Sequence, residues 1–181
     1  MRTLLESASI RLEALTEEHF DALVEIALSQ PDLLQFSPSP FGSAEALRAN
    51  FDQAFAAREL GTRFPFAIFD KVSQAYVGST SFGSYSAKDK RLEIGWTWIR
   101  KEVQGTGLNG FCKQLMLSYA FHELQIERVE FKTDSRNVRS QKAIEKLGAT
   151  LEGELRSHSV MKDGFRRNTH IYSILKNEFV D

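Results

Sequence analysis

A glycine-rich stretch past the middle of the chain contains the residues best suited to bind an anion. It lies between an apolar run over 92–99 and a helix-like run over 111–122, and it consists of Gln104, Gly105, Thr106, Gly107, Leu108, Asn109 and Gly110. Glycines let the backbone turn tightly and approach a ligand closely. The free amides in the first turn of the following helix and the positive end of its dipole favour a phosphate group. The stretch therefore predicts an anion-binding loop that needs neither a lysine nor a metal ion.

Two common phosphate-binding motifs do not fit this loop. A Walker A loop ends in Gly-Lys-Ser/Thr, whereas Leu108 and Asn109 follow Gly107 here. A Rossmann fingerprint has three spaced glycines at the first strand-to-helix turn, but this loop comes after several predicted strands. Both a P-loop NTPase and a dinucleotide-binding domain are therefore disfavoured. A lone Gly-x-Gly also fits a plain strand-to-helix bend, so motifs in the rest of the chain are needed to distinguish an anion-binding loop from such a bend.

The elements around the loop follow from hydrophobic periodicity. Period-2 alternation and turn signals predict strands over 9–15, 64–69, 76–82, 92–99, 128–133, 149–154 and 169–175. Helical spacing, caps and stop signals predict helices between 16 and 31, 43 and 61, 111 and 122, and 138 and 147. An irregular connection over 31–41 and a polar loop over 83–90 complete the chain. A mostly antiparallel sheet with helices beside it is an α+β arrangement.

The strand that leads into the loop is predicted to have two different faces. Simple alternation gives one face to Leu92, Ile94, Trp96 and Trp98. It gives the other face to Glu93, Gly95, Thr97 and Ile99. The Glu93 carboxylate is thus expected to be half exposed on the less apolar face.

The composition indicates an ordinary globular chain, which we interpret as one domain over residues 1–181. A net charge of -1 argues against non-specific nucleic-acid binding, which requires clustered Lys and Arg. The single Cys112 excludes an intramolecular disulfide and fits a reducing cytoplasm; within a helical run it is better interpreted as a buried hydrophobe than as a nucleophile. Neither a signal peptide nor the ~20 apolar residues of a membrane span is recognisable, so no membrane association is expected.

Several motifs in the C-terminal half resemble one family. Gln104-x-x-Gly107 matches the Gln/Arg-x-x-Gly-x-Gly/Ala loop that binds acetyl-coenzyme A in the GNAT superfamily of N-acetyltransferases, with Asn109 in place of the last Gly or Ala. The segments 131–134, 137–149 and 152–153 are similar to the RimJ/RimL-like branch, which contains ribosomal-protein N-terminal acetyltransferases. The resemblance is dense over 93–175 and covers the N-terminal half only in the order of its elements.

This resemblance implies the GNAT fold, in which the strands before and after the loop and its helix are parallel neighbours that splay apart. Acetyl-coenzyme A would bind as co-substrate at 104–110, and its pantetheine arm would bond to backbone near Trp98 and Ile99. Unpaired strand edges offer the donors and acceptors for such bonds. The resemblance also implies that Asn137 caps the next helix and contacts the cofactor. Ser140 would bond the thiol sulfur or merely support that cap.

The implied reaction is direct attack of a primary amine on the thioester in a ternary complex, which requires a base, oxyanion stabilisation and protonation of the thiolate. Glu93 is the first candidate for the base, and a cross-strand ion pair with Arg91 or a lysine is an equally good interpretation. His158 and His170 on the final hairpin are candidates for a proton relay, or packing residues. Many members have a tyrosine acid where this chain has Ile144, so Ser140 or a water would have to supply the proton.

The acceptor is left open by this resemblance. A protein N-terminus, a small-molecule amine such as an amino acid, polyamine or antibiotic, and a non-catalytic acyl-coenzyme A sensor are all compatible with the sequence. We expect the acceptor to bind between the 31–41 connection and the final hairpin, over an aromatic floor of Phe36 and Trp96. The oligomeric state is also open, and a homodimer is one of the states allowed.

Overall fold

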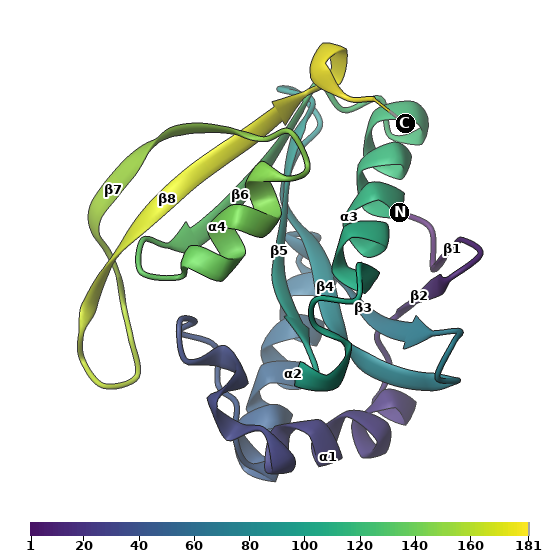
Figure 1. The fold of residues 1–181 in the computed structure, drawn as a ribbon, viewed down its shortest axis with the longest axis vertical. Helices are drawn as coiled ribbons and strands as arrows, with labels where there is room; N and C mark the ends of the chain where they lie inside the picture. The colour runs from purple at the N-terminus through teal and green to yellow at the C-terminus, as the bar shows by residue number, and fades with distance from the viewer. Residues whose placement is uncertain (181) are drawn as a thin grey trace.

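The chain forms a mixed sheet of eight strands in the order β1-β2-β3-β4-β5-β6-β8-β7, in a computed structural model that describes residues 1–180 (Figure 1). The strands are β1 (Leu4–Glu6), β2 (Ile10–Ala14), β3 (Arg63–Asp70), β4 (Ala75–Ser86), β5 (Arg91–Ile99), β6 (Arg128–Asp134), β7 (Thr150–Val160) and β8 (Arg166–Leu175). The α-helices are α1 (Phe20–Ser29), α2 (Ala44–Glu59), α3 (Leu108–Ser118) and α4 (Val138–Glu145). All paired neighbours are antiparallel except β5 and β6, which confirms the predicted α+β class.

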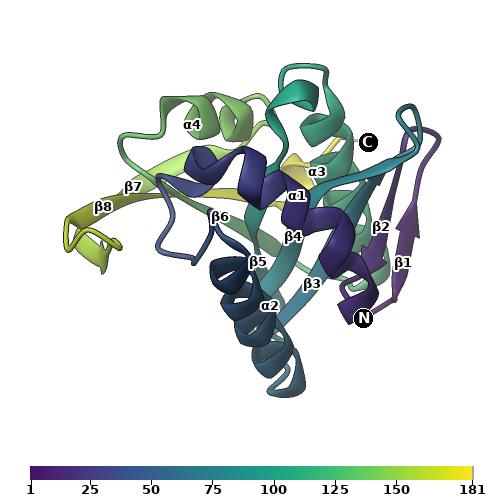
Figure 2. The ribbon, with the colours of Figure 1, turned by 90° about the horizontal axis from the view of Figure 1, so that it is seen from below.

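Helices cover both faces of the sheet. Figure 2 shows α3 and α4 on one face, α2 on the other, and α1 across the end nearest the viewer. Beneath α3, a large hydrophobic cluster contains Phe82, Ile94 and Phe131. A second cluster, under α1 and α2, contains Phe51 and Trp98. We call the first side the α3 face and the second the Glu93 face.

The central strands β5 and β6 pair over a short distance only. Their register joins Arg91–Glu93 to Arg128–Glu130, and neither strand continues the pairing beyond that point. β5 runs on to Ile99 beside β4, while β6 runs on to Asp134 beside β8. Figure 1 shows the two strands diverging from this point. The facing edges of the strands therefore form an open notch with Glu93 at its closed end, as the family resemblance predicts.

A bulge in β5 overturns the predicted alternation along that strand. The register with β4 shifts between Ser79 and Ser81, and Trp96 adopts a left-handed φ of 51°. The extra residue rotates the following side chains by one position. Leu92 and Ile94 therefore face α3, whereas Trp98 packs in the cluster beneath α1 and α2. The prediction that all four apolar residues share one face is wrong, because it assumed an unbroken strand.

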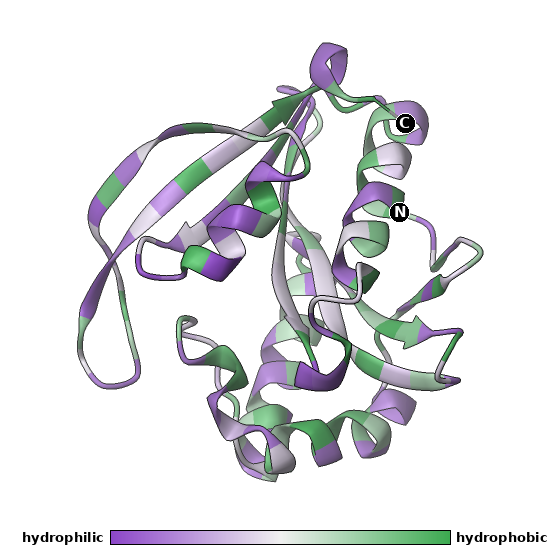
Figure 3. Cartoon of the chain, viewed as in Figure 1, coloured by the Kyte–Doolittle hydropathy of each residue, from purple (hydrophilic) through white to green (hydrophobic). Residues whose placement is uncertain are grey.

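Other boundaries differ from the predicted ones in modest ways. The short β1 was not predicted, and β4 continues to Ser86 through part of the predicted polar loop over 83–90. The 31–41 connection begins with a 3-10 turn at Pro31–Leu34. The final hairpin is longer than predicted, and hydrophilic residues recur along β7 and at the hairpin tip (Figure 3). Among residues 1–180, no helix combines the length and apolarity needed to cross a membrane.

Candidate active site

The glycine loop enters α3 with two residues in left-handed conformations. Gly105 has φ 81° and Gly107, the N-cap of α3, has φ 93°. A Cβ on Gly105 would meet no atom within 4 Å, and one on Gly107 would meet only the Phe111 ring, at 3.6 Å. Backbone conformation, rather than packing, therefore requires these glycines. An added Cβ would meet no close obstacle at Gly105 and only the Phe111 ring at Gly107, so a phosphate group can approach the backbone here.

Hydrogen bonds hold the loop in this shape. The Gln104 side chain donates through Nε2 to the Ile99 carbonyl at 2.7 Å, and the Thr106 hydroxyl donates to the Val103 carbonyl at 2.8 Å. The Asn109 side-chain oxygen is buried and has no hydrogen-bond partner within residues 1–180. Buried polar atoms without partners are rare in folded proteins. The preshaped loop fits a site for the phosphates of acetyl-coenzyme A, which its backbone amides can bind. The Asn109 oxygen is an acceptor and could bond only a donor group of that ligand.

The start of α4 is tied to this loop. Arg139 donates to the side-chain oxygen of Gln104, so it joins the helix to the strand-to-helix turn. Asn137 caps α4, because its Oδ1 accepts from the Ser140 amide at 3.1 Å. Ile144, where many family members have a tyrosine, is 8% exposed and belongs to the core. Residues 137 and 140 therefore lie on the helix that flanks the notch, and the capping role expected of Asn137 is present.

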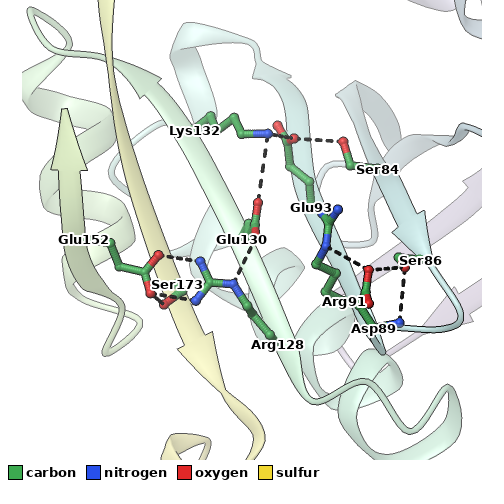
Figure 4. Close-up of polar contacts among 10 residues, drawn as sticks. All are labelled: Ser84, Ser86, Asp89, Arg91, Glu93, Arg128, Glu130, Lys132, Glu152 and Ser173. Carbon is green, nitrogen blue, oxygen red and sulfur yellow. Dashed lines mark hydrogen bonds and ion pairs between the residues drawn. The ribbon is translucent and has the colours of Figure 1, made fainter. Parts of the chain in front are cut away.

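Glu93 is more buried than its sequence suggested. Only 8% of the residue is exposed, so the expectation of a half-exposed carboxylate is wrong. Its Oε2 lies 2.7 Å from the Lys132 ammonium and accepts a hydrogen bond from the Ser84 hydroxyl at 3.2 Å (Figure 4). The ion pair that we considered beside the base is therefore present, with a lysine of β6 as partner. A base at this position would act while bonded to Lys132 and Ser84.

Further ion pairs lie beside the Glu93–Lys132 pair, on β6 and β7. Arg128 bonds Glu130 at 3.0 Å and holds Glu152 through two hydrogen bonds (Figure 4). Bonding to Arg128 lowers the pKa of Glu152 to about 2, with help from the Ser173 hydroxyl. The Glu152 carboxylate therefore stays charged near neutral pH. Arg128 bonds both Glu130 and Glu152, and these ion pairs stabilise the fold.

The two histidines of the final hairpin lie on different faces. His158 bonds the Thr169 hydroxyl at 3.0 Å, and Thr169 pairs with Asp134, which alternates with Lys132 along the Glu93 face. His170 pairs with Thr133 on the opposite face, bonds Glu154 at 3.0 Å and leaves its Nδ1 buried without a partner within residues 1–180. Only His158 is therefore on the same side of the sheet as Glu93.

The predicted aromatic floor residues both lie on the Glu93 face. Trp96 stands over Gly83, where an added Cβ would meet its ring at 2.4 Å. Phe36, in the 31–41 connection, is half-buried, and its carbonyl accepts from Arg167 of β8 at 2.8 Å. The connection and the final hairpin, between which we expect the acceptor to bind, are thus in contact.

Lys113 is a residue that our reading of the sequence overlooked. It is 6% exposed, and its ammonium donates to the hydroxyls of Thr80 and Thr97, the latter in the β5 bulge. No carboxylate within residues 1–180 pairs with it, and burial lowers its pKa to about 8. The sequence does indicate that Lys113 is buried, because the residue falls in the buried stripe of α3 between Cys112 and Met116.

This geometry defines a class of protein. Two parallel strands that diverge beside a glycine loop, with an acid at the closed end, make the fold and the site of a GNAT acyltransferase. The chain belongs to the family described as Acetyltransferase (GNAT) domain, which matches residues 9–150. The chain thus contains a GNAT acetyltransferase domain, as the motifs predicted, and it spans 55% and 63% of the lengths of the first two curated relatives that it matches.

Three similar proteins illustrate the relationship. YdaF of Bacillus subtilis (strain 168), whose name provisionally assigns it to ribosomal N-acetylation, is 30% identical over 102 residues, or 56% of this chain and 55% of YdaF. A crystal structure of a T. thermophilus protein provisionally named an acetyltransferase is 34% identical, with a TM-score of 0.88 over 98% of this chain and 92% of that one. An acetyl transferase of Salmonella typhimurium, described as modifying the N-terminal serine of ribosomal protein L7/L12, is 22% identical, with a TM-score of 0.84 over 98% and 99%.

Proposed function

We propose that this N-acetyltransferase transfers an acetyl group from acetyl-coenzyme A to the α-amine of a protein N-terminus. GNAT acetyltransferases use acetyl-coenzyme A. The observation that carries the proposal is the notch, in which the open glycine loop lies at one end of the unpaired β5 edge and Glu93 at the other. An extended ligand bound at the loop can follow this edge through backbone hydrogen bonds.

Residues of the loop and of α4 would bind the co-substrate. The first-turn amides of α3 and its dipole favour the negative pyrophosphate, and both glycines allow close approach. Asn109 stands in place of the usual small residue, and its unpartnered side-chain oxygen could bond only a donor group of the ligand, not its phosphates. Ser140, in the first turn of α4, has a hydroxyl that can bond the sulfur. Acetyl-coenzyme A supplies the activated acetyl group when it is bound there.

Glu93 would remove the proton of the attacking amine. It is the last β5 residue that pairs with β6, so it lies where the notch closes. An amine that is mostly protonated must lose a proton before it attacks. A carboxylate can accept that proton directly or through one bridging water molecule. Lys132 and Ser84 hold the carboxylate in one orientation. His158, on the same face, is the second candidate for this role.

A protein N-terminus is the acceptor that the comparisons favour. YdaF and the Salmonella neighbour are named for ribosomal or N-terminal acetylation, although the chain spans only 55% of YdaF and the neighbour is 22% identical. The contact between Phe36 and Arg167 would form one wall of the acceptor site. The single Cys112 fits a reaction in a reducing cytoplasm. A small-molecule amine remains the second candidate acceptor.

A thiol-release screen tests this proposal. Purified protein and acetyl-coenzyme A would be incubated separately with N-terminal peptides, free amino acids, polyamines and aminoglycosides. We expect release above the background rate with peptides, and loss of that release in Gly107→Val. Release with only small amines would assign the second acceptor class. Tight binding of acetyl-coenzyme A without turnover on any acceptor would support a sensor instead.

A further inference from the structure

The carboxylates on the Glu93 face of β5 and β6 each have a cation. Glu93 pairs with Lys132 at 2.7 Å, Glu130 with Arg128 at 3.0 Å, and Asp134 with Arg136 at 2.7 Å. Two further arginines lie on this face, on strands two places away from β5, and neither forms an ion pair with a carboxylate within residues 1–180. They are Arg63 of β3 and Arg167 of β8.

Arg63 is a buried cation next to the predicted acceptor site. It lies opposite Gly83, which in turn lies opposite Glu93, so the three residues share a face. The residue is 8% exposed; its Nε donates to the Ser81 hydroxyl at 2.8 Å, and its guanidinium lies 5.0 Å from the centre of the Trp96 ring. No ion pair within residues 1–180 neutralises it, and burial lowers its pKa to about 10. Such a charge is costly to bury unless something compensates it.

Arg167 is the corresponding cation on the other side of the notch. Its Nη1 donates to the Phe36 carbonyl at 2.8 Å, while its Nε is buried without a partner within residues 1–180. Asp134 lies close enough to interact with it electrostatically, but both oxygens of that carboxylate are bonded to Arg136. Burial lowers the pKa of the Arg167 guanidinium. An orphaned donor on an arginine fits an acceptor oxygen supplied by a ligand.

We propose that Arg63 and Arg167 select an acceptor that carries a carboxylate near its reactive amine. The inference deepens the proposed function and rests on it. Arg63 lies directly across β4 from Glu93, roughly 10 Å away at ~4.8 Å per strand. Arg167 lies farther along β8, beyond Thr169, but its long side chain brings the guanidinium close enough to Glu93 to interact with it electrostatically. An extended peptide covers ~3.3–3.6 Å per residue, so an acidic side chain within the first three residues of a peptide reaches either arginine from an amine at Glu93. Free aspartate or glutamate offers the same chemistry from a smaller source.

Paired acceptors test this selectivity. Short peptides that begin Ser-Asp or Ser-Ala-Glu would be compared with their amide twins, Ser-Asn and Ser-Ala-Gln, and free aspartate and glutamate with asparagine and glutamine. A hydrogen bond to a charged partner contributes ~1.5–3 kcal/mol, so kcat/KM should favour the acidic member of each preferred pair by about 10- to 100-fold. Preference within the peptide pairs or within the amino-acid pairs identifies the source of the carboxylate.

Variants of the arginines connect the preference to these side chains. Arg63→Gln and Arg167→Gln should each lower the ratio of kcat/KM for the acidic acceptor to kcat/KM for its amide twin by about 10-fold or more. Calorimetric titration with the acidic acceptor alone should show the same loss of affinity without turnover. If Arg63→Gln does not fold, Arg63→Lys replaces it: the charge stays but the planar set of donors is lost, so the preference for the acidic acceptor should fall without disappearing. The matched control is Arg48→Gln, because Arg48 also lies over an aromatic ring but pairs with Glu17 on the surface.

The outcomes separate this inference from the proposed function. Equal turnover of acidic and amide peptides by the wild-type protein would overturn the carboxylate selectivity and leave N-terminal acetylation standing. A preference that survives both Arg→Gln variants would also overturn the assignment. If no peptide or amino acid is acetylated but the acidic ones bind and both variants abolish binding, the subsite stands and the proposed function fails.

Discussion

Replacing Lys113 with Met should stabilise the protein at neutral pH. Lys113 is buried without a carboxylate, and its pKa falls from 10.5 to about 8. At pH 7 the ammonium is charged in both the folded and the unfolded chain, so the folded state bears the whole desolvation penalty. The difference between the two pKa values corresponds to about 3 kcal/mol of unfolding free energy. Methionine has a similar length, and Thr80 and Thr97, which already bond each other at 2.8 Å, keep each other as partners when the ammonium is removed.

The gain in unfolding free energy from Lys113→Met should depend on pH. Between pH 8 and 10.5 the folded protein binds fewer protons at Lys113 than the unfolded chain, so wild-type stability rises with pH in that interval. The advantage of Lys113→Met should therefore be full below pH 8 and should disappear as the pH approaches 10.5. Because other groups titrate in the same range, the quantity to compare is the difference between the two proteins.

Urea unfolding from pH 7 to 10 measures that difference. Midpoints and slopes would be recorded for wild type, Lys113→Met and Lys88→Met, a control lysine in an exposed turn. The Lys113 variant should have the higher midpoint at pH 7, and the gap should narrow at higher pH. A variant that is less stable than wild type by the same amount at every pH would refute the reasoning, since it would show that Lys113 contributes favourable contacts and no desolvation penalty.

Three further predictions concern the notch. Gly107→Val should abolish calorimetric binding of acetyl-coenzyme A while circular dichroism stays native, because the branched side chain fills open space and disfavours φ 93°; binding as tight as that of wild type would disprove the loop assignment. Glu93→Gln should lower kcat about 100-fold or more, with partial recovery at high pH. It should also cost about 1–2 kcal/mol in urea unfolding, because Lys132 loses its nearer carboxylate partner and keeps only Glu130 at 4.0 Å; an unchanged rate would move the base to His158. Asn137→Ala should cost about 1 kcal/mol through loss of the α4 cap, whereas Asn137→Asp should restore it, and equal stability of all three proteins would contradict the capping role.

Segments with clear hydrophobic periodicity, helix caps or turn residues predicted most of the fold. Alternation located β2 and β3, and Ser43 and Asn137 marked the starts of α2 and α4. The glycine loop was recognisable because its spacing and neighbours matched a family pattern. The parallel pairing of β5 with β6 came from that resemblance as well, since local periodicity carries no information on which distant strands become neighbours.

The parts that could not be predicted depend on tertiary structure. Nothing in the composition of β5 marks Trp96 as left-handed, because a bulge is stabilised by the strands around it. Burial of Glu93 requires β6 to place Lys132 beside it, and the two residues are far apart in the chain. Arg63 stands at the start of a strand, where an exposed arginine is the ordinary expectation. Its burial follows from the position of Trp96 after the bulge.

Mass spectrometry of an acetylated peptide tests the proposed transfer most directly. The peptide should begin Ser-Asp, carry an internal lysine and be incubated with acetyl-coenzyme A and the wild-type protein, with Gly107→Val as the control. We predict one acetyl group per peptide, located by fragmentation on the N-terminal amine and absent with the variant. Acetyl on the lysine side chain alone, or on the N-terminus equally with wild type and Gly107→Val, would contradict transfer to an α-amine from the β5–β6 notch.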